Sequence, residues 1–511
     1  MHVDQARHQS LSTLLRRSAA RHGNKPAIIC GEISWSYLMF DDIVDALGRG
    51  LIDRGIAKGD RVAILARNSH VFAALRFAVA RIGAVLVPIN FMLTAEEVRY
   101  VLDHSGARLL FVDRTTKALG LDARTAAVEA IFGIAGEGIA PPDGIPSWDT
   151  LCRPGPIPDE VVSADDLLQI IYTSGTESRP KGAMLTHGAV LWQYQSCVID
   201  CEWSARTVAL HALPMFHCAQ LDAMLGPALQ SGATNIITAT ASPDNLIPLL
   251  SRYKVTSFFS PPTVWIGILR SPLLDDADLS QLACGYYGAS IMPVEILREL
   301  ARRLPALRLW NLYGQTEIAP VATVLFPHEH GDRAGSAGRP TLHVSTRIVD
   351  DAMHDVPAGE IGEIVHQSPQ LMIGYWNDAK RTAEAFAGGW FHSGDLGVMD
   401  ADGYITIVDR KKDMIKSGGE NVSSREVEEV LYGHPGIAEA AVIGMPDPRW
   451  IEAVTAVVVA RQGQAITEAE VIDYCRTRLA GFKLPKRVVI AESLPKNASG
   501  KVLKRELRAL V

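Results

Sequence analysis

The sequence predicts an α/β fold: a large N-terminal domain of parallel-sheet α/β layers, a small β subdomain and a small C-terminal α/β domain. At 511 residues the chain is too long for one hydrophobic core, which indicates two or more domains. Short apolar runs alternate with helical patterns over the first third, as in parallel sheets flanked by helices. Beyond residue 335, turn-rich β segments replace that alternation.

Composition excludes several classes of protein. The apolar fraction of 48% and the charged fraction of 21% are those of an ordinary soluble globular protein. The net charge of −7 gives no basic footprint for a nucleic acid, and no apolar run approaches the roughly 18 residues that suggest a membrane span. Seven scattered cysteines without an export signal indicate reduced thiols. We therefore expect a cytoplasmic protein, with peripheral attachment to a membrane surface as the alternative, and a homodimer remains open.

The first third of the chain supplies the alternating elements. Residues 1–23 contain basic side chains but no apolar signal segment, and they indicate an amphipathic helix. Residues 136–138 (GEG) run into two prolines instead of a helix, which argues against a dinucleotide-binding fold. We expect strands at 61–66, 84–88 and 109–112 and a helix at 69–82.

A loop rich in glycine and hydroxyl groups follows the apolar run 167–172, which indicates a buried strand. Residues 172–187 are YTSGTESRPKGAMLTH. Hydroxyls, backbone N–H groups and cations on one short loop suit a polyphosphate, whose charge is spread over many oxygens. The loop differs from a Walker loop, in which Gly-Lys-Ser/Thr opens a helix. The candidate phosphate ligands are Thr173, Ser174, Gly175, Thr176 and Lys181.

This loop resembles the phosphate loop of the adenylate-forming superfamily, which includes acyl-CoA synthetases, aryl-CoA ligases, luciferase and peptide-synthetase adenylation domains. Glu177 and Ser178 stand where the common form has Thr-Gly. The resemblance extends from about residue 10 to the end, with five motifs in the family's order. It implies an AMP-binding domain at 1–408, a hinge at 409–412 and a mobile lid domain at 413–511.

Three further motifs resemble the family's acyl and nucleotide pockets: 213–217 (LPMFH), 285–290 (GYYGAS) and 310–317 (WNLYGQTE). The resemblance implies that Thr316 contacts the α-phosphate and that Glu317 holds Mg²⁺, a hard cation that requires a carboxylate. It implies nucleotide contacts at Gly288, Ala289, Ser290, Asn311, Tyr313 and Gly314, and acyl contacts at His217, Tyr287, Gly288, Gly314 and Ile318.

Two later motifs resemble the ribose and CoA contacts of the family. Asp395 lies in Gly-Asp-Leu-Gly, where the family's aspartate accepts both ribose hydroxyls, and Arg410 matches its ribose arginine. Lys412 matches the pivot about which the lid rotates. The segment 416–421 (KSGGEN) implies a tunnel for the CoA arm at Ser417, Gly418 and Gly419.

The last hundred residues indicate the small α/β domain, with helices at 424–432 and 468–479 and strands at 440–444 and 453–459. Ile451 departs from the family, in which glycine is frequent at this position. The terminal segment 495–508 contains Pro-x-x-x-x-Gly-Lys, and the resemblance makes Lys501 the catalytic lysine.

The resemblance implies an ATP-dependent acyl-CoA ligase that uses ATP, Mg²⁺ and CoA and forms an acyl-adenylate. A carboxylate attacks an anionic phosphate poorly, and Lys501 would reduce that repulsion. The pattern favours a medium- or long-chain fatty acid. The alternatives are an aryl or cinnamic acid of the feruloyl type, an acyl-AMP ligase that loads a carrier protein, and a non-catalytic nucleotide-binding protein.

Overall fold

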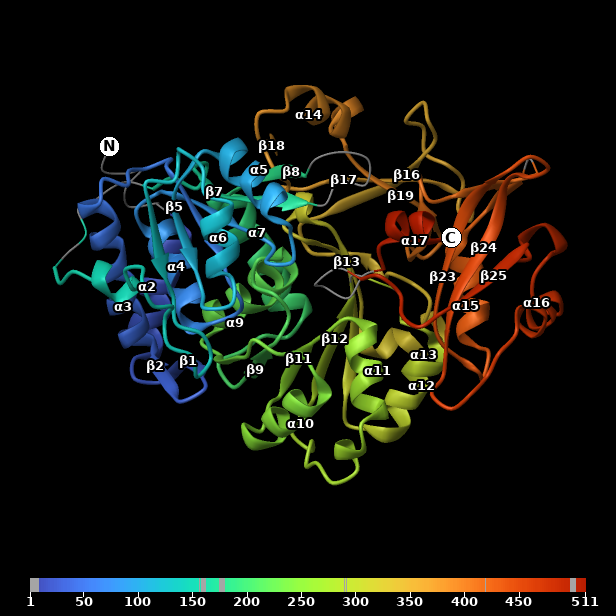
Figure 1. Ribbon diagram of the computed structural model, residues 1–511, viewed down its shortest axis with the longest axis horizontal. Helices are drawn as coiled ribbons and strands as arrows, with labels where there is room; N and C mark the ends of the chain where they lie inside the picture. The colour runs from blue at the N-terminus through green and yellow to red at the C-terminus, as the bar shows by residue number, and fades with distance from the viewer. Residues whose placement is uncertain are drawn as a thin grey trace.

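The computed structural model describes residues 9–155, 157, 162–173, 180–288, 290, 292–418, 420–496 and 502–511. Figure 1 shows the N-terminal domain as two neighbouring α/β halves, with the C-terminal domain on the side opposite the N-terminus. Among the described residues, no helix is both long enough and apolar enough to span a bilayer. Six of the predicted site residues lie outside the described residues: Ser174, Gly175, Thr176, Ala289, Gly419 and Lys501.

The first half of the N-terminal domain is built on a seven-stranded sheet of order β18-β8-β7-β4-β3-β5-β6. Five of its strands, from β7 to β6, are parallel, which confirms the α/β alternation predicted for this part. The strands are β3 (Arg61–Leu65), β4 (Val85–Pro88), β5 (Ala107–Val112), β6 (Ala130–Gly133), β7 (Leu167–Thr173), β8 (Lys181–Thr186) and β18 (Gly374–Tyr375).

The second half contains a nine-stranded sheet of order β15-β14-β13-β12-β11-β9-β10-β1-β2. Its central strands, from β13 to β1, are parallel. The strands are β1 (Pro26–Cys30), β2 (Ile33–Ser36), β9 (Val208–His211), β10 (Thr234–Ile237), β11 (Ser257–Phe259), β12 (Cys284–Gly288), β13 (Arg308–Gly314), β14 (Val321–Leu325) and β15 (Arg339–Pro340).

Helices pack on and between these two sheets (Figure 1). Every residue of α4 is buried, which is the packing expected of a helix enclosed by other elements and not of a surface helix. The helices of the N-terminal domain are α2 (Leu11–His22), α3 (Tyr37–Asp53), α4 (His70–Arg81), α5 (Ala95–Ser105), α6 (Lys117–Asp122), α7 (His187–Asp200), α8 (Cys218–Gln220), α9 (Gly226–Ser231), α10 (Pro243–Arg252), α11 (Pro262–Arg270), α12 (Val294–Arg303), α13 (His330–Arg333) and α14 (Ala379–Ala385), with a π-helical turn η2 (Leu221–Leu225) and a 3-10 turn η4 (Thr316–Ile318).

The predicted β subdomain is a four-stranded antiparallel sheet: β16 (Ser345–Val349), β17 (Gly362–Gln367), β19 (Phe391–Met399) and β20 (Ile405–Arg410). The first two residues of the predicted hinge, Asp409 and Arg410, complete β20 and pair with β19. The turn itself comprises residues 411–413.

The C-terminal domain has its own sheet and its own apolar core. The sheet order is β22-β21-β24-β23, and β25 pairs with β24. Val427, Val442 and Val458 lie in its core. The predicted helix 468–479 ends three residues early, at Arg476, because the Arg478 N–H bonds to the Cys475 carbonyl and tightens the last turn. The elements are β21 (Ile415–Ser417), β22 (Glu420–Val422), α15 (Ser424–Tyr432), β23 (Ile437–Asp447), β24 (Ile451–Ala460), α16 (Glu468–Arg476), β25 (Arg487–Ala491) and α17 (Lys504–Leu510).

Candidate active site

The candidate site lies where the two large sheets of the N-terminal domain meet. β7 ends at Thr173, whereas β12 and β13 end at Gly288 and Gly314, so all three strands point their carboxyl ends toward this region. The segment that precedes β18 joins the sheets, because the Met372 N–H bonds to the Glu317 carbonyl at 2.8 Å. In open α/β sheets, ligands bind at the carboxyl ends of strands.

Glu317 is held by a tyrosine that the sequence motifs do not contain. The Tyr375 hydroxyl donates a hydrogen bond of 2.9 Å to Glu317 Oε1, and Lys181 Nζ lies 5.1 Å from the centre of the Tyr375 ring. Burial raises the pKa of Tyr375, and the nearby Glu317 carboxylate raises it further, so the hydroxyl remains a proton donor. Lys181, in turn, pairs with Thr173 across β7 and β8. Predicted phosphate and metal ligands are therefore gathered in one place.

Thr316 connects this cluster to the segment that carries His217. Its hydroxyl oxygen lies 3.2 Å from Cys218 Sγ, and Cys218 opens the short helix α8. His217 precedes that helix, and its Nδ1 accepts a hydrogen bond of 3.3 Å from the Ala219 N–H. Burial raises the pKa of the Cys218 thiol, so Cys218 is a neutral packing group and not a thiolate nucleophile.

The predicted ribose contacts form a second cluster, on the β subdomain. The Tyr313 hydroxyl donates a hydrogen bond of 2.7 Å to Asp395 Oδ2, and Arg410 Nε lies 3.2 Å from Asp395 Oδ1. Asp395 and Arg410 are cross-strand partners in β19 and β20, which explains how distant motifs come together. Both carboxylate oxygens of Asp395 thus have a partner in the protein.

Two predicted ligand glycines have a structural reason of their own. A Cβ on Gly288 would lie 2.3 Å from the Leu312 carbonyl oxygen, and one on Gly314 would lie 1.9 Å from the Pro320 carbonyl oxygen. Either side chain would force the backbone of β12 or β13 away from its neighbour. The close approach of these backbones therefore requires glycine independently of any ligand.

The remaining predicted nucleotide and acyl residues differ in their surroundings. Tyr287 is buried in the core of the second half, and its hydroxyl lies 3.0 Å from His330 Nε2. The Asn311 amide donates to the Ser336 carbonyl at 2.9 Å, Ile318 is buried in a small apolar cluster, and Ser290 is exposed. Contact of these residues with substrate stays a prediction.

The backbone beside the predicted CoA side shows why glycine suits the position of Ile451. Ser417 pairs with Ile451 in β21 and β24, and the Gly418 N–H bonds to the Trp450 carbonyl at 2.7 Å. Ile451 has a φ of +69°, in the left-handed region that β-branched residues rarely adopt. Glycine would adopt this conformation without steric cost, which is a physical reason for its frequency at the position.

The side chains present fit a Mg²⁺ ion that arrives with ATP. Among the described residues, no group of three or more His, Cys, Asp or Glu side chains could hold a metal. Mg²⁺ in nucleotide sites is commonly held by one or two carboxylates together with substrate phosphates. Glu317 supplies such a carboxylate beside the cationic Lys181.

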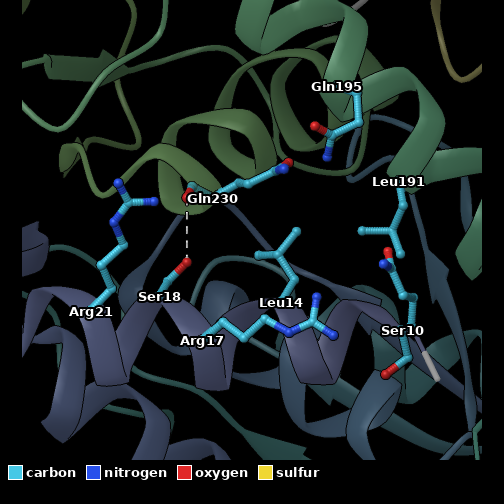
Figure 2. A pocket seen from close by; sticks show the side chains of 9 residues that line it. Ser10, Leu14, Arg17, Ser18, Arg21, Leu191, Gln195 and Gln230 are labelled. Atoms are coloured by element: carbon cyan, nitrogen blue, oxygen red, sulfur yellow. Dashed lines mark hydrogen bonds between the residues drawn. The ribbon is translucent and has the colours of Figure 1, made fainter. Parts of the chain in front are cut away.

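The hollow shown in Figure 2 is separate from the candidate active site. It has a volume of about 190 Å³ and lies between α2, α7 and α9, with Arg17 and Arg21 on one side and Gln195 and Gln230 opposite. None of its lining residues is a predicted site residue. The candidate active site is therefore identified by its chemical groups and not by this hollow.

Comparison with known proteins identifies the family to which the chain belongs. A sequence model described as "AMP-binding enzyme" matches residues 15–376, and one described as "AMP-binding enzyme C-terminal domain" matches residues 426–501. Feruloyl-CoA synthase from Amycolatopsis sp is 38% identical, over 98% of this chain and 99% of its own. The long-chain-fatty-acid–CoA ligase FadD13 from Mycobacterium tuberculosis is 35% identical, over 93% of each chain.

A solved structure shares the whole architecture. The anthranilate CoA ligase AuaEII, in complex with anthranoyl-AMP, superimposes with a TM-score of 0.91 at 26% identity, over 98% of this chain and 97% of its own. The predicted family and fold class are thereby confirmed. The chain belongs to the AMP-binding enzyme family and is an AMP-forming acid–thiol ligase of the acyl-CoA ligase type.

Proposed function

We propose that this ligase joins an aromatic carboxylic acid to CoA through an acyl-adenylate, with Lys501, Thr316 and Glu317 as its catalytic residues. The observation that carries the adenylation site is the cluster of Lys181, Tyr375, Glu317 and Thr316 between the two sheets. Relatives named for ferulate and anthranilate support the aromatic substrate.

In the first half-reaction the substrate carboxylate attacks the α-phosphorus of ATP, and the bond to pyrophosphate breaks. Both reactants are anions, so the attack requires positive charge between them. Lys501 supplies it at the carboxylate and the α-phosphate, and Thr316 orients the α-phosphate. Lys181 neutralises charge on the departing pyrophosphate. Glu317 would hold a Mg²⁺ ion, which would supply further positive charge there.

The nucleotide is oriented by the second cluster. Asp395 accepts hydrogen bonds from the ribose hydroxyls, and Arg410 beside it also contacts the ribose. Because Tyr313 and Arg410 already hold both oxygens of Asp395, the carboxylate is oriented before ATP binds. Tyr313 stacks on the purine.

In the second half-reaction the CoA sulfur attacks the acyl carbon, and AMP leaves. The C-terminal domain rotates about Lys412 for this step, so that Ser417 and Gly418 line the path of the thiol and Lys501 withdraws. The hydrogen bond from the Gly418 N–H to the Trp450 carbonyl holds the two strands that would border that path.

A fatty acid is the second candidate substrate, because the chain is also 35% identical to a long-chain-fatty-acid ligase. The identity with the feruloyl relative is higher, 38% over nearly the whole chain. The aromatic acid is therefore our first candidate.

A substrate panel tests the proposal. CoA-dependent AMP release would be measured with ferulate, anthranilate, hexanoate, palmitate and malonate, and with a carrier protein in place of CoA. We expect kcat/KM for an aromatic acid to exceed that for either fatty acid by about tenfold or more. A higher value for hexanoate or palmitate would replace the aromatic assignment, and transfer to the carrier protein alone would replace CoA as acceptor.

A further inference from the structure

A charged pair is buried in the N-terminal domain beside the candidate site. Arg76 Nη2, on α4, lies 2.8 Å from Asp222 Oδ1, on the π-helical turn η2. The exposed fractions of the two side chains are 1% and 0%. Neither residue belongs to a motif of the family resemblance. Among the residues that the structure describes, neither forms a hydrogen bond with a predicted ligand residue.

Two further elements bond to the same carboxylate. Gln169 Nε2, on β7, donates to Asp222 Oδ2 at 2.7 Å, and the Tyr194 hydroxyl, on α7, donates to Oδ1 at 3.3 Å. A glycine makes room for the tyrosine, because a Cβ on Gly226 would lie 1.9 Å from its ring. Four elements therefore meet at Asp222: α4, β7, α7 and η2.

The network also reaches the turn that follows Glu317. The Gln193 amide, oriented as its surroundings require, donates to the Asp222 carbonyl at 2.9 Å and to the Ala319 carbonyl at 3.0 Å. Ala319 lies two residues beyond Glu317 in the sequence. The backbone of the η4 turn is thus fixed to the backbone of η2.

Each end of the network lies close in the chain to a proposed reactive group. Gln169 precedes Thr173 by four residues in β7. Asp222 follows Cys218 by four residues, and Cys218 Sγ lies 3.2 Å from the Thr316 hydroxyl. A shift of η2 or β7 would therefore change the spacing between Thr173, Thr316 and Glu317.

The pair is poorly suited to a purely stabilising role. Buried ion pairs stabilise only when hydrogen bonds offset their desolvation, and among the described residues Arg76 Nε and Nη1 have no partner. Burial raises the pKa of Asp222, and the Arg76 guanidinium opposes that rise. What the network does specify is geometry, since directional bonds from three elements converge on one turn. π-Helical turns are frequent at functional sites.

We propose that Arg76, Asp222 and Gln169 are positioning residues for adenylation, which hold β7 and the η4 turn at the spacing that the triphosphate and its metal require. The inference rests on the proposed roles of Thr173, Thr316 and Glu317. It predicts an effect on one half-reaction only. Adenylation needs the β- and γ-phosphates held against Glu317, whereas thioester formation starts after pyrophosphate has left.

The test uses two variants of the full-length protein. The double variant R76M/D222L removes both charges together and so leaves no unpaired buried charge. Gln169→Met removes only the bond between β7 and Asp222, and it provides a milder change if the double variant folds poorly. Adenylation is measured as ferulate-dependent ATP–pyrophosphate exchange, and thioester formation is measured from supplied feruloyl-adenylate and CoA.

Arg81→Met is the matched control. Arg81 lies on the same helix, and its side chain is also buried, but its partners are Asp41 and Asp45 on α3 and Ser12 on α2. Loss of these interactions should lower the Tm of the protein. It should not change the ratio of the two half-reaction rates, because α2 and α3 carry no proposed ligand residue.

We expect the ratio of adenylation to thioester rate to fall about tenfold in R76M/D222L and about threefold in Gln169→Met. Ratios within twofold of wild type in both variants, or an equal fall in Arg81→Met, would overturn the inference. A wild-type protein that shows no exchange with ferulate or any other acid of the panel would overturn the proposed function as well. Exchange by the wild type with unchanged ratios in the variants would overturn the inference alone.

Discussion

The N-terminal domain contributes Lys181, Thr316, Glu317, Tyr375 and Asp395 to the candidate site, and we call this part the N-terminal wall. The wall and the C-terminal domain differ in how their polar groups are held. On the wall, Glu317 and Asp395 each receive a hydrogen bond from a tyrosine of the same domain. On the C-terminal domain, Gly418 and Ile451 lie on exposed strand ends, and 66% of the Ile451 surface is exposed. The carboxylates of the wall are thus oriented by the protein itself, whereas Gly418 and Ile451 are exposed to solvent.

The attachment of the C-terminal domain explains how one part can be rigid and the other movable. The start of α15 bonds to β20: the Ser424 N–H donates to Asp409 Oδ2 at 2.7 Å, and the Ser423 hydroxyl donates to the Val408 carbonyl at 2.7 Å. Arg425 Nη2 reaches the Gly335 carbonyl at 3.2 Å. These contacts between the two domains are polar, and the C-terminal domain keeps its own apolar core, so we expect it to be able to move as a unit.

The helix that follows the predicted catalytic lysine is tied to this attachment. Lys504 Nζ, at the start of α17, bonds to the Ser424 hydroxyl at 2.5 Å and pairs with Glu428 at 2.9 Å. Ser424 also bonds to Asp409, at the end of β20. The position of α17 is therefore linked to Asp409, the first residue of the predicted hinge.

The largest effect should come from removing Lys501, the cation that we propose the C-terminal domain brings to the wall. We expect Lys501→Ala to slow adenylation on the order of 10²–10³-fold, because the two reacting anions lose the charge between them. Thioester formation from supplied acyl-adenylate should change less than threefold, since Lys501 has withdrawn in that step. Single-turnover assays of both half-reactions measure this.

Lys496→Ala is the control for that variant. Its Nζ is paired with Glu439 within the C-terminal domain at 2.7 Å, so removing it should leave both rates near wild type. Equal losses in the two half-reactions of Lys501→Ala would contradict a division of labour between the wall and the moving domain.

The sequence predicts the parts of the site that lie in contiguous motifs and misses those made by tertiary packing. Asp395 and Arg410 are recognisable, because each lies in a patterned segment. Tyr375 belongs to a strand of two residues whose pairing with β8 depends on the folded domain, and no local pattern distinguishes it from a core aromatic.

The buried charges illustrate the same limit. The helical spacing at 69–82 correctly predicts α4, yet an arginine in a helix is normally expected on an exposed face. Only the packing of α4 between other elements buries Arg76 beside Asp222, 146 residues away in the sequence. Because α4 is buried on all sides, it has no polar face, and the partner of Arg76 could not be predicted from the helical pattern.

An intermediate effect should follow from restricting the proposed pivot between the two regions. Proline at position 412 fixes φ near −65° and restrains Lys411 as well. We expect Lys412→Pro to lower CoA-dependent AMP release about tenfold while pyrophosphate exchange stays within twofold, because only the thiol step needs the rotated domain. Unchanged steady-state turnover would remove Lys412 as the pivot.

Lys412→Ala is the matched control, because it removes the same side chain and leaves the backbone free to rotate. Near-normal turnover in this variant would assign the loss in Lys412→Pro to the backbone. If Lys412→Ala loses as much activity as Lys412→Pro, the side chain and not the rotation is what matters.

The smallest effect concerns stability within the C-terminal domain. Ile451 has a φ of +69°, and a β-branched residue in that region costs on the order of 1–3 kcal/mol. Glycine removes this cost but adds backbone entropy to the unfolded state, about 0.5–1 kcal/mol. We therefore expect Ile451→Gly to raise the local free energy of opening of β23 and β24 by about 1 kcal/mol, the difference between these terms. Hydrogen exchange of the amides in the two strands measures it.

Ile490→Gly provides the opposite case in the same domain. Ile490 is also an exposed isoleucine of a strand, but it does not have a positive φ, so glycine there should lower the opening free energy by about 0.5–1 kcal/mol. Opposite signs at the two positions would show that the strained conformation at 451 destabilises the strands beside Gly418. A fall at both positions would mean that the burial and pairing of Ile451 outweigh its strain. In that case the proposed CoA side would be held as firmly as the N-terminal wall, and the contrast between the two regions would lie in the attachment of the domain alone.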